Sequence, residues 1–251
     1  MKLSQLCSVL DTELRIAEYQ DIDLSLNGLQ VSSSDKQIRK VGLAVDACQA
    51  SFDQAVKQEC DLLFVHHGLF WGRPLAISGT HYQRIKRLLD GDCALYAAHL
   101  PLDAHPELGN NAQIARLLGL EALEAFDSYK GKAIGFKGQL PKPEAIDEII
   151  LRLGSARPLE RLDFGSQQVR SIGIVSGAAA DDLDQAIDEN LDLYITGEAS
   201  HITYHQALEA HINILCLGHY FTETFGVRAV GRMLGEKLGL ECIFIDLPTG
   251  L

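Results

Sequence analysis

The chain has 251 residues, enough for one large domain or two modest ones, and its hydrophobic fraction of 47% is ordinary for a globular protein with a core. Its 34 acidic residues outnumber its 22 basic residues and give a formal net charge of -12. An acidic chain repels nucleic-acid phosphates and anionic lipid heads, so we expect neither direct nucleic-acid binding nor adsorption to a membrane.

The N-terminal stretch does not read as a targeting signal, because Asp11, Glu13 and Arg15 interrupt any signal-peptide core. No apolar run approaches the roughly 18 residues of a membrane span. None of the six cysteines belongs to a Cys-x-x-Cys pair, which argues against a thiolate zinc site or a redox motif. Most of them lie in apolar stretches, as buried thiols do in a reducing compartment. We therefore predict a cytoplasmic protein.

Two stretches of the chain share one pattern, a short apolar strand followed by a helix and a second apolar strand. The segments are residues 41–46, 53–56 and 61–65 in the first stretch and 172–176, 184–187 and 192–196 in the second. Gly42 and Asp61 have the same separation as Gly173 and Asp192, with no gap needed. Chance similarity between α/β units is the alternative, but the matched spacing favours an internal duplication.

Each stretch predicts a pair of parallel strands, because the apolar runs suit buried strands and the connection is long enough for a helical crossover. Further predicted elements are third strands at residues 93–98 and 212–217, helices at 111–118, 143–153 and 227–234, and a strand at 133–138. We therefore predict an α/β fold of two related lobes with mainly parallel sheets, residues 1–125 and 126–251.

Polar side chains follow three of the predicted strands where those strands end. His66 and His67 end the second strand, a His-x-x-x-Asp pair (His99 and Asp103) follows the third, and a His-x-x-x-Glu pair (His219 and Glu223) follows its counterpart in the second lobe. The carboxyl ends of parallel strands meet at one edge of a sheet, where ligands collect. If the turn after each strand is helical, residues four apart share a face. The repeat then predicts two matched histidine–carboxylate pairs.

Imidazole and carboxylate groups together suit zinc, iron, manganese or nickel. The five side chains of His66, His67, Asp103, His219 and Glu223 are too many for a single tetrahedral ion with an open position, and they suit two ions about 3.5–4 Å apart. Surface pairs or solvated helix faces are the alternative for any one of these features. Their occurrence at three strand ends favours the metal site.

Two further groups at the same edge are candidates for moving protons. Glu198 aligns with His67 in the repeat, and His205 lies four residues after His201. Contact with substrate or with a ligand is more plausible for these histidines than metal binding, and an exposed face is more plausible than either. We predict Glu198 and His205 as candidate catalytic residues.

Five motifs together resemble the NIF-three-like family of dinuclear-metal proteins, whose members often carry the name GTP cyclohydrolase I type 2 homologue. They are NGLQV at residues 27–31, FVHHGLFW at 64–71, HLPLDAHP at 99–106, ITGE at 195–198 and GHYFTE at 218–223. The resemblance runs nearly end to end. It implies the NIF-three-like fold, the same five metal ligands, and a homo-oligomer in the form of a toroidal hexamer with its metal sites facing an internal cavity.

The function that these observations favour is a hydrolase that uses two divalent metal ions on a nucleotide-like or phosphate-bearing substrate, such as GTP. Two divalent ions carry more positive charge than two carboxylates neutralise, and the excess attracts hydroxide or phosphate. Two alternatives stay open. The chain could bind or deliver metal without turnover, or act as a transcription-linked adaptor through protein partners, as the origin of the family name suggests.

Overall fold

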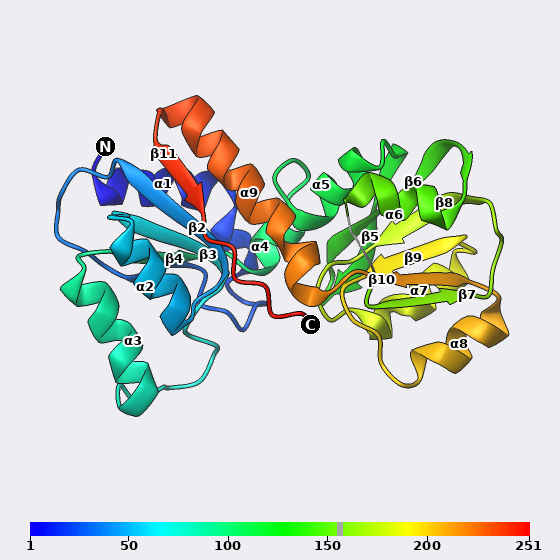
Figure 1. Cartoon of the computed structure of the whole chain (residues 1–251), viewed down its shortest axis with the longest axis horizontal. Helices are drawn as coiled ribbons and strands as arrows, with labels where there is room; N and C mark the ends of the chain where they lie inside the picture. Colours follow the sequence, from blue (N-terminus) through cyan, green and yellow to red (C-terminus); the bar gives the residue numbers. More distant parts are fainter. Residues whose placement is uncertain (155–157) are drawn as a thin grey trace. The chain divides into compact units, whose positions relative to one another are not determined.

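The first sheet of the computed structural model belongs to a unit built from both ends of the chain. The structure describes residues 1–154 and 158–251. They form two compact units, the first of Met1–Leu102 with Val227–Leu247 and the second of Asp103–Gly226 with Pro248–Leu251. Each unit holds one sheet with helices on it (Figure 1).

The first unit contains a five-stranded sheet in the order β1-β4-β3-β2-β11. Its strands are β1 (Gly28–Val31), β2 (Lys40–Asp46), β3 (Leu62–His67), β4 (Ala94–Ala97) and β11 (Glu241–Phe244). Its helices are α1 (Leu3–Glu13), the 3-10 helix η1 (Ile16–Tyr19), α2 (Gln49–Lys57) and α3 (Gly79–Asp90), with the C-terminal part of α9 (His219–Leu238). All neighbouring strands run parallel except β1, which is antiparallel to β4.

Both faces of the first sheet are covered, which is why its central strands read as continuous apolar runs. On one face, Phe52 of α2 and Leu88 of α3 pack against strand residues such as Val65. On the other face, Tyr96 of β4 donates a hydrogen bond to Asp11 of α1 over 2.6 Å between the oxygens. Gly231 of α9 passes so close to β2 that a Cβ there would lie 2.2 Å from the Leu43 side chain.

The second unit contains a six-stranded sheet in the order β5-β6-β8-β9-β10-β7. Its strands are β5 (Glu121–Tyr129), β6 (Lys132–Glu144), β7 (Glu160–Asp163), β8 (Val169–Ile174), β9 (Leu193–Thr196) and β10 (Asn213–Cys216). Its helices are α5 (Asn110–Leu117), α6 (Ile146–Leu153), the 3-10 helix η2 (Ala180–Asp182), α7 (Leu183–Asp188), α8 (Thr203–Ala210) and the first turns of α9, while the short α4 (Leu100–Asp103) spans the boundary between the units.

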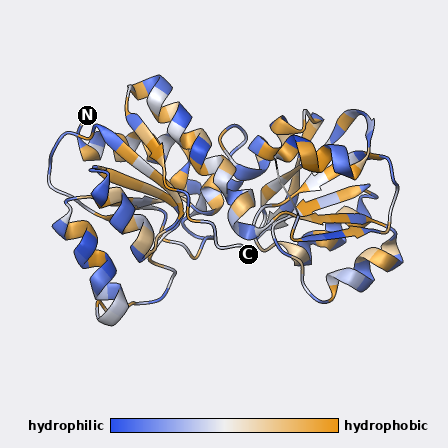
Figure 2. Ribbon diagram, viewed as in Figure 1, coloured by the Kyte–Doolittle hydropathy of each residue, from blue (hydrophilic) through white to orange (hydrophobic). Residues whose placement is uncertain are grey.

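The second sheet also has helices on both faces. Helices α5 and α6 cover one face with residues such as Ile114 and Ile149, packed against Ile172 and Ile195. Helices α7 and α8 cover the other face in a cluster around Tyr194. Figure 2 shows the apolar colouring concentrated along the strands of each sheet. This two-sided burial explains why the sequence signal for these strands was an apolar run and not an alternation.

The two predicted strand–helix–strand units are topologically equivalent. Strands β2 and β3 pair in parallel with Gly42 opposite Leu63, and β8 and β9 pair in parallel with Gly173 opposite Tyr194. In each unit the next strand, β4 or β10, continues the parallel order. The predicted α/β class and the internal correspondence are confirmed.

The recurring aspartates have a structural explanation. Asp61 accepts backbone hydrogen bonds from Arg39 and Lys40 at the start of β2, at 2.8 and 3.0 Å. Asp192 accepts the corresponding bonds from the backbone nitrogens of Arg170 and Ser171, at 2.9 Å each. Each carboxylate therefore accepts hydrogen bonds from the two backbone N–H groups at the start of the neighbouring strand. These donors need an acceptor, which explains why an aspartate recurs at that position of the repeat.

The predicted lobe boundary between residues 125 and 126 falls inside β5, and the compact units divide the chain elsewhere. Residues 103–125 belong to the second unit, and β11 returns residues 227–247 to the first by pairing in parallel with β2. Both sheets are mixed. In the first, β1 is antiparallel to β4, and in the second the pairs β5–β6, β6–β8 and β7–β10 are antiparallel. Edge strands such as β7 carry polar residues and give little apolar signal.

The six cysteines are free thiols, four of them buried, as the apolar context of most of them predicted. Burial raises the pKa of Cys60 to about 11 and that of Cys93 to about 12, so these thiols are protonated near neutral pH. No helix among the described residues is long and apolar enough to cross a membrane.

Replacing Asp182 with asparagine is expected to stabilise the protein near neutral pH. Burial, followed by the charges of Asp127 and Asp181, raises the pKa of Asp182 to about 6. The folded state therefore binds this proton more tightly than the unfolded state, and the ionised carboxylate destabilises it above that pKa. With Asp182 partly exposed, we expect a gain of about 1 kcal/mol.

The measurement is thermal unfolding of both proteins in chelator at about pH 7.5 and about pH 4.5. The difference should shrink at the lower pH, because the wild-type carboxyl then becomes protonated in the folded state. A difference of equal size at both pH values would contradict the assignment.

Candidate metal centre

Three histidines of the first unit bring their rings together at the carboxyl edge of its sheet. His66 and His67 end β3, and His99 follows β4. One ring nitrogen of each lies within 4.8 Å of the others. The ring centroids of His66 and His67 are 4.6 Å apart, and those of His66 and His99 are 5.2 Å apart. The adjacent parallel strands β3 and β4 therefore place three imidazoles close together. The position of His66 and His67 at the end of a strand predicted that these two lie at this edge of the sheet.

Each of these rings is held through its Nδ1 atom. His66, which is fully buried, donates from Nδ1 to the Ala98 carbonyl oxygen at 3.0 Å, since a carbonyl can only accept. The Nδ1 atom of His67 lies 2.8 Å from Oδ1 of Asp46 at the end of β2. A hydrogen on Nδ1 leaves the lone pair on Nε2, which is the usual arrangement of histidines that bind metals.

The third ring is held by a carboxylate that also organises the surrounding loop. Asp23 Oδ1 lies 3.0 Å from His99 Nδ1, and the backbone nitrogen of Leu100 donates to Asp23 Oδ2 at 3.0 Å. Asn27 donates to the same Oδ2 atom at 2.8 Å. Burial alone would raise the pKa of Asp23, but hydrogen bonds from His99, Asn27 and Ser25 outweigh it and hold that pKa below its usual value. The ionised carboxylate then requires a hydrogen on His99 Nδ1.

In the second unit, His219 and Glu223 lie on the first turn of α9 and their side chains approach each other. His219 Nε2 is 3.1 Å from Glu223 Oε1, as expected for residues four apart on a helix. Two ligands bound to one ion at about 2.0–2.1 Å lie about 3 Å apart, so this distance suits a shared ion. His219 Nδ1 lies 2.5 Å from Glu198 Oε1, so Glu198 orients this ring as Asp46 orients His67.

Asp103 is the second buried carboxylate of the same unit. Its Oδ1 atom accepts hydrogen bonds from Asn110 Nδ2 at 2.8 Å and from Ser176 Oγ at 3.0 Å. The Asn110 amide is oriented in turn, because its Oδ1 atom accepts from the Gly226 backbone nitrogen at 2.7 Å. One oxygen of Asp103 and one of Glu223 lie within 4.8 Å of each other. Two carboxylates held this close repel unless a cation neutralises them.

Two glycines leave room for the His219 and Glu223 side chains of the second unit. A Cβ at Gly177 would lie 2.6 Å from Glu223 Oε1 and 3.3 Å from His219 Nε2, and its φ of +73° also favours glycine. A Cβ at Gly197 would lie 2.6 Å from the Gly177 carbonyl oxygen and 2.8 Å from the His219 Cα atom. The close approach of backbone to both ligands therefore depends on these two positions.

The donor sets fit a divalent metal. The first unit presents three imidazoles, and the second presents one imidazole with two buried carboxylates, a combination that suits transition metals. The surrounding groups fix the orientation of each ligand before any ion binds. The buried histidine, glutamate and aspartate clusters are thus consistent with a metal site, and they contain all five of the residues predicted as ligands.

The other candidates from the sequence lie elsewhere in the second unit or act indirectly. His205 is exposed on α8, with its ring centroid 5.4 Å from that of Tyr204. Glu198 contacts the proposed ligand His219. The sequence interpretation did not identify Asp46, Asp23 or Asn110. Asp46 had a detectable signal, because it ends a strand at the same edge, whereas Asp23 and Asn110 lie outside the strand ends.

The strand register shifts one predicted correspondence. Spacing matched His99 with His219, but the structural register matches His99 with Gly218, one residue earlier. The register pairs that fix this are Val65 with Ala97 and Thr196 with Cys216. His219 therefore begins α9, at the position that corresponds to Leu100 at the start of α4. The similar spacing of the two histidine–carboxylate pairs is not a residue-by-residue repeat.

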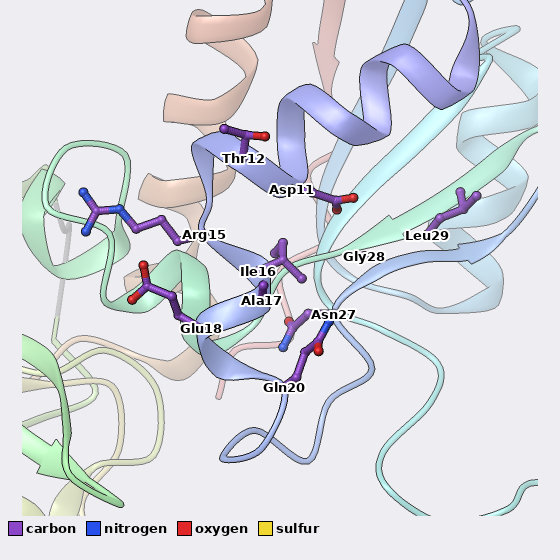
Figure 3. A pocket seen from close by; sticks show the side chains of 10 residues that line it. All are labelled: Asp11, Thr12, Arg15, Ile16, Ala17, Glu18, Gln20, Asn27, Gly28 and Leu29. Carbon is purple, nitrogen blue, oxygen red and sulfur yellow. The ribbon is translucent and has the colours of Figure 1, made fainter.

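A separate surface pocket of about 560 Å³ lies in the first unit, between the end of α1 and the start of β1. Its lining includes Asp11, Arg15, Gln20 and Asn27 (Figure 3). Asp11 already accepts the Tyr96 hydroxyl, and Asn27 belongs to the Asp23 network. The pocket lining contains no histidine, so the histidine and carboxylate clusters remain the candidate metal site.

Comparison with known proteins places these clusters in context. The family model described as Duf34/NIF3 (NGG1p interacting factor 3) matches residues 1–249. A protein of Archaeoglobus fulgidus named GTP cyclohydrolase 1 type 2 homolog is 47% identical over 251 residues and covers 100% of both chains. A protein of the same name from Pyrococcus abyssi is 41% identical over 254 residues, also with 100% of both chains covered.

The solved structures agree with the sequence comparisons. The crystal structure of the protein TTHA1606 from Thermus thermophilus is 42% identical, covers 100% of both chains and superposes with a TM-score of 0.92. The fold of the chain and its sequence over its full length thus lead to one assignment. The chain belongs to the Duf34/NIF3 family.

Proposed function

We propose that the chain is a hydrolase that uses two divalent metal ions on a nucleotide-like or phosphate-bearing substrate. The proposed ligands are His66, His67, Asp103, His219 and Glu223, and zinc, iron, manganese and nickel all suit this set. The observation that carries the proposal is the convergence of imidazoles whose Nδ1 atoms are held by oxygen atoms and whose ring nitrogens lie within 4.8 Å of one another.

The number of donors supports two ions. Five side chains are too many for one tetrahedral ion that keeps an open position, and they leave positions open on two ions. When bound, such ions lower the pKa of a water molecule and hold a substrate oxygen. Two carboxylates leave two of the four positive charges without a protein counterion, which favours a phosphate-bearing substrate.

The residues of the chain would contribute orientation. Asp46 and Glu198 fix the rings of His67 and His219, and the donors around Asp103 fix its carboxylate. Proton transfer by Glu198 or His205 stays a prediction. The contact of Glu198 with His219 supports an orienting role, and the exposed position of His205 supplies no contact with the proposed ligands. The cytoplasmic location and the homohexamer implied by the family resemblance also stay predictions.

Chelation is expected to abolish turnover and to lower the thermal midpoint. Binding at about 100 times the dissociation constant stabilises a folded protein by about 2.7 kcal/mol, which corresponds to about 5–10 °C for a chain of this size. The measurement is elemental analysis of protein purified without added metal, followed by hydrolysis assays with GTP, other nucleotides and simple phosphoesters, with and without chelator.

Two outcomes would change the assignment. Bound metal with no turnover on any of these compounds would favour the metal-binding or metal-delivering alternative. Turnover that survives complete removal of metal would contradict the proposed mechanism. An adaptor role would instead be indicated by a protein partner that co-purifies stoichiometrically with a chain lacking turnover.

A further inference from the structure

The single tryptophan of the chain is exposed and yet held in one orientation. Trp71 lies in the loop after β3, and 40% of its surface is accessible. Its indole Nε1 donates a hydrogen bond to the Gly68 carbonyl oxygen at 2.9 Å. An aromatic side chain with its polar atom satisfied presents only apolar surface to solvent, which is costly unless something covers it.

This indole borders the imidazole cluster of the same unit. Its ring centroid lies 4.9 Å from that of His99, at an interplanar angle of 74°, and 6.0 Å from that of His67. Asp23 fixes His99, and Asp46 fixes His67. The flat indole is therefore part of a rigid wall beside the nitrogens proposed to bind metal.

A second segment pairs with the loop that carries Trp71. Leu26 donates its backbone N–H to the Phe70 carbonyl oxygen at 2.9 Å, and Ser25 forms a β-bridge with Trp71. The Leu24 side chain packs at Gly72, where a Cβ would lie 3.4 Å from it. Leu24 and Leu26 are 62% and 53% exposed. This backbone pairing fixes the loop that carries Trp71, and the alternation of side chains places Ser25, not the two leucines, on the face of the indole.

We propose that Trp71 is a specificity-determining residue that stacks against a planar heteroaromatic ring of the substrate. This inference rests on the proposed function, which assigns the anionic end of the substrate to the metal ligands. It narrows the substrate class from any phosphate ester to a phosphate joined to a planar ring, as in a nucleotide. An indole face binds any such ring, so the contact selects the ring class and not one base.

The lone tryptophan allows a direct test, because its fluorescence reports on this position alone. Metal-loaded protein is titrated with GMP, AMP, ribose 5-phosphate and inorganic phosphate. We expect the two nucleotides to quench the emission and to bind about 10- to 100-fold more tightly than ribose 5-phosphate, as loss of one stacked base predicts.

Variants separate stacking from other roles, with binding measured by equilibrium dialysis. Trp71→Leu should weaken nucleotide binding about 10- to 100-fold and leave ribose 5-phosphate binding and metal content unchanged. Trp71→Phe keeps an aromatic face and should restore most of the affinity. Tyr82→Leu, which removes another exposed aromatic ring of the first unit, is the matched control and should change nothing.

The outcomes distinguish this inference from the function on which it rests. Equal binding of nucleotides and ribose 5-phosphate, or no effect of Trp71→Leu, would overturn the stacking role with the metal site intact. A change of oligomer mass in Trp71→Leu with unaltered nucleotide affinity would also overturn it and assign the indole to an interface between protein chains. Quenching by nucleotides in a protein that binds no metal would support stacking and contradict the proposed hydrolase.

Discussion

Replacing Glu223 with alanine is expected to remove at least half of the metal that the protein binds. Glu223 is 3% exposed, and its carboxylate approaches both His219 and Asp103. A carboxylate in this position can bridge two ions, so its loss weakens both. Elemental analysis after gel filtration measures the effect. Glu209→Ala, which removes an exposed glutamate on α8, is the control and should retain full metal content.

The same variant should behave differently without metal. In chelator, the wild-type protein keeps two buried carboxylates close together, and removing one relieves their repulsion. We therefore expect Glu223→Ala to lose most of the thermal stabilisation that added metal gives, while its midpoint in chelator falls by less than the loss of a buried side chain would suggest. Full metal content in this variant would refute the assignment of Glu223 as a ligand.

The sequence predicted which side chains cluster at the candidate site because the rule behind that prediction is geometric. Parallel strands end at one edge, so polar residues that directly follow buried strands must lie close together. His66 and His67 satisfied this rule, and His219 and Glu223 satisfied it together with helical spacing. These predictions needed only the positions of the strands, which continuous apolar runs indicated clearly.

The residues that orient the ligands could not be found in this way. Asp23 forms a hydrogen bond with His99, and Asn110 forms one with Gly226, although each pair is far apart in the sequence. Such contacts depend on how loops close over the sheet edge, and neither periodicity nor strand-end position encodes them. The sequence did not predict edge strands such as β7, for a related reason. Strand β7 pairs on one side only, and three of its four residues are charged, so it lacks the apolar run that identified the central strands.

The unit boundaries show a third limit. The repeat led to a division near residue 125, but β11 joins the first sheet after the whole second unit has been traversed. Pairing between β2 and β11 is a contact between distant segments, and short strands of mixed polarity could pair with several partners. The local sequence pattern therefore identified the repeated units, but it did not indicate which sheet the C-terminal strand joins.

Replacing His67 with alanine is expected to abolish metal-dependent hydrolysis without unfolding the chain. Its ring contacts Asp46 and Trp71 at the rim of the sheet and contributes little to the core. Loss of a group that merely orients a ligand costs about 10- to 100-fold in metal affinity or activity, so loss of the ligand itself should exceed that. Asp46→Asn should fall within that range. Rates are measured on the best substrate from the nucleotide screen, and circular dichroism in chelator checks the fold.

The controls for this prediction use the other histidines. His201→Ala removes an exposed imidazole and should leave the rate unchanged. Equal rates from wild type, His67→Ala and His99→Ala would identify a contaminating hydrolase. Full metal content and full activity in His67→Ala, combined with loss of both in His99→Ala, would move the ligand role to His99, whose nitrogen lies in the same cluster. Because Asp23 already fixes that ring, the structure makes His99 the residue that could replace His67, and the pair of variants decides between them.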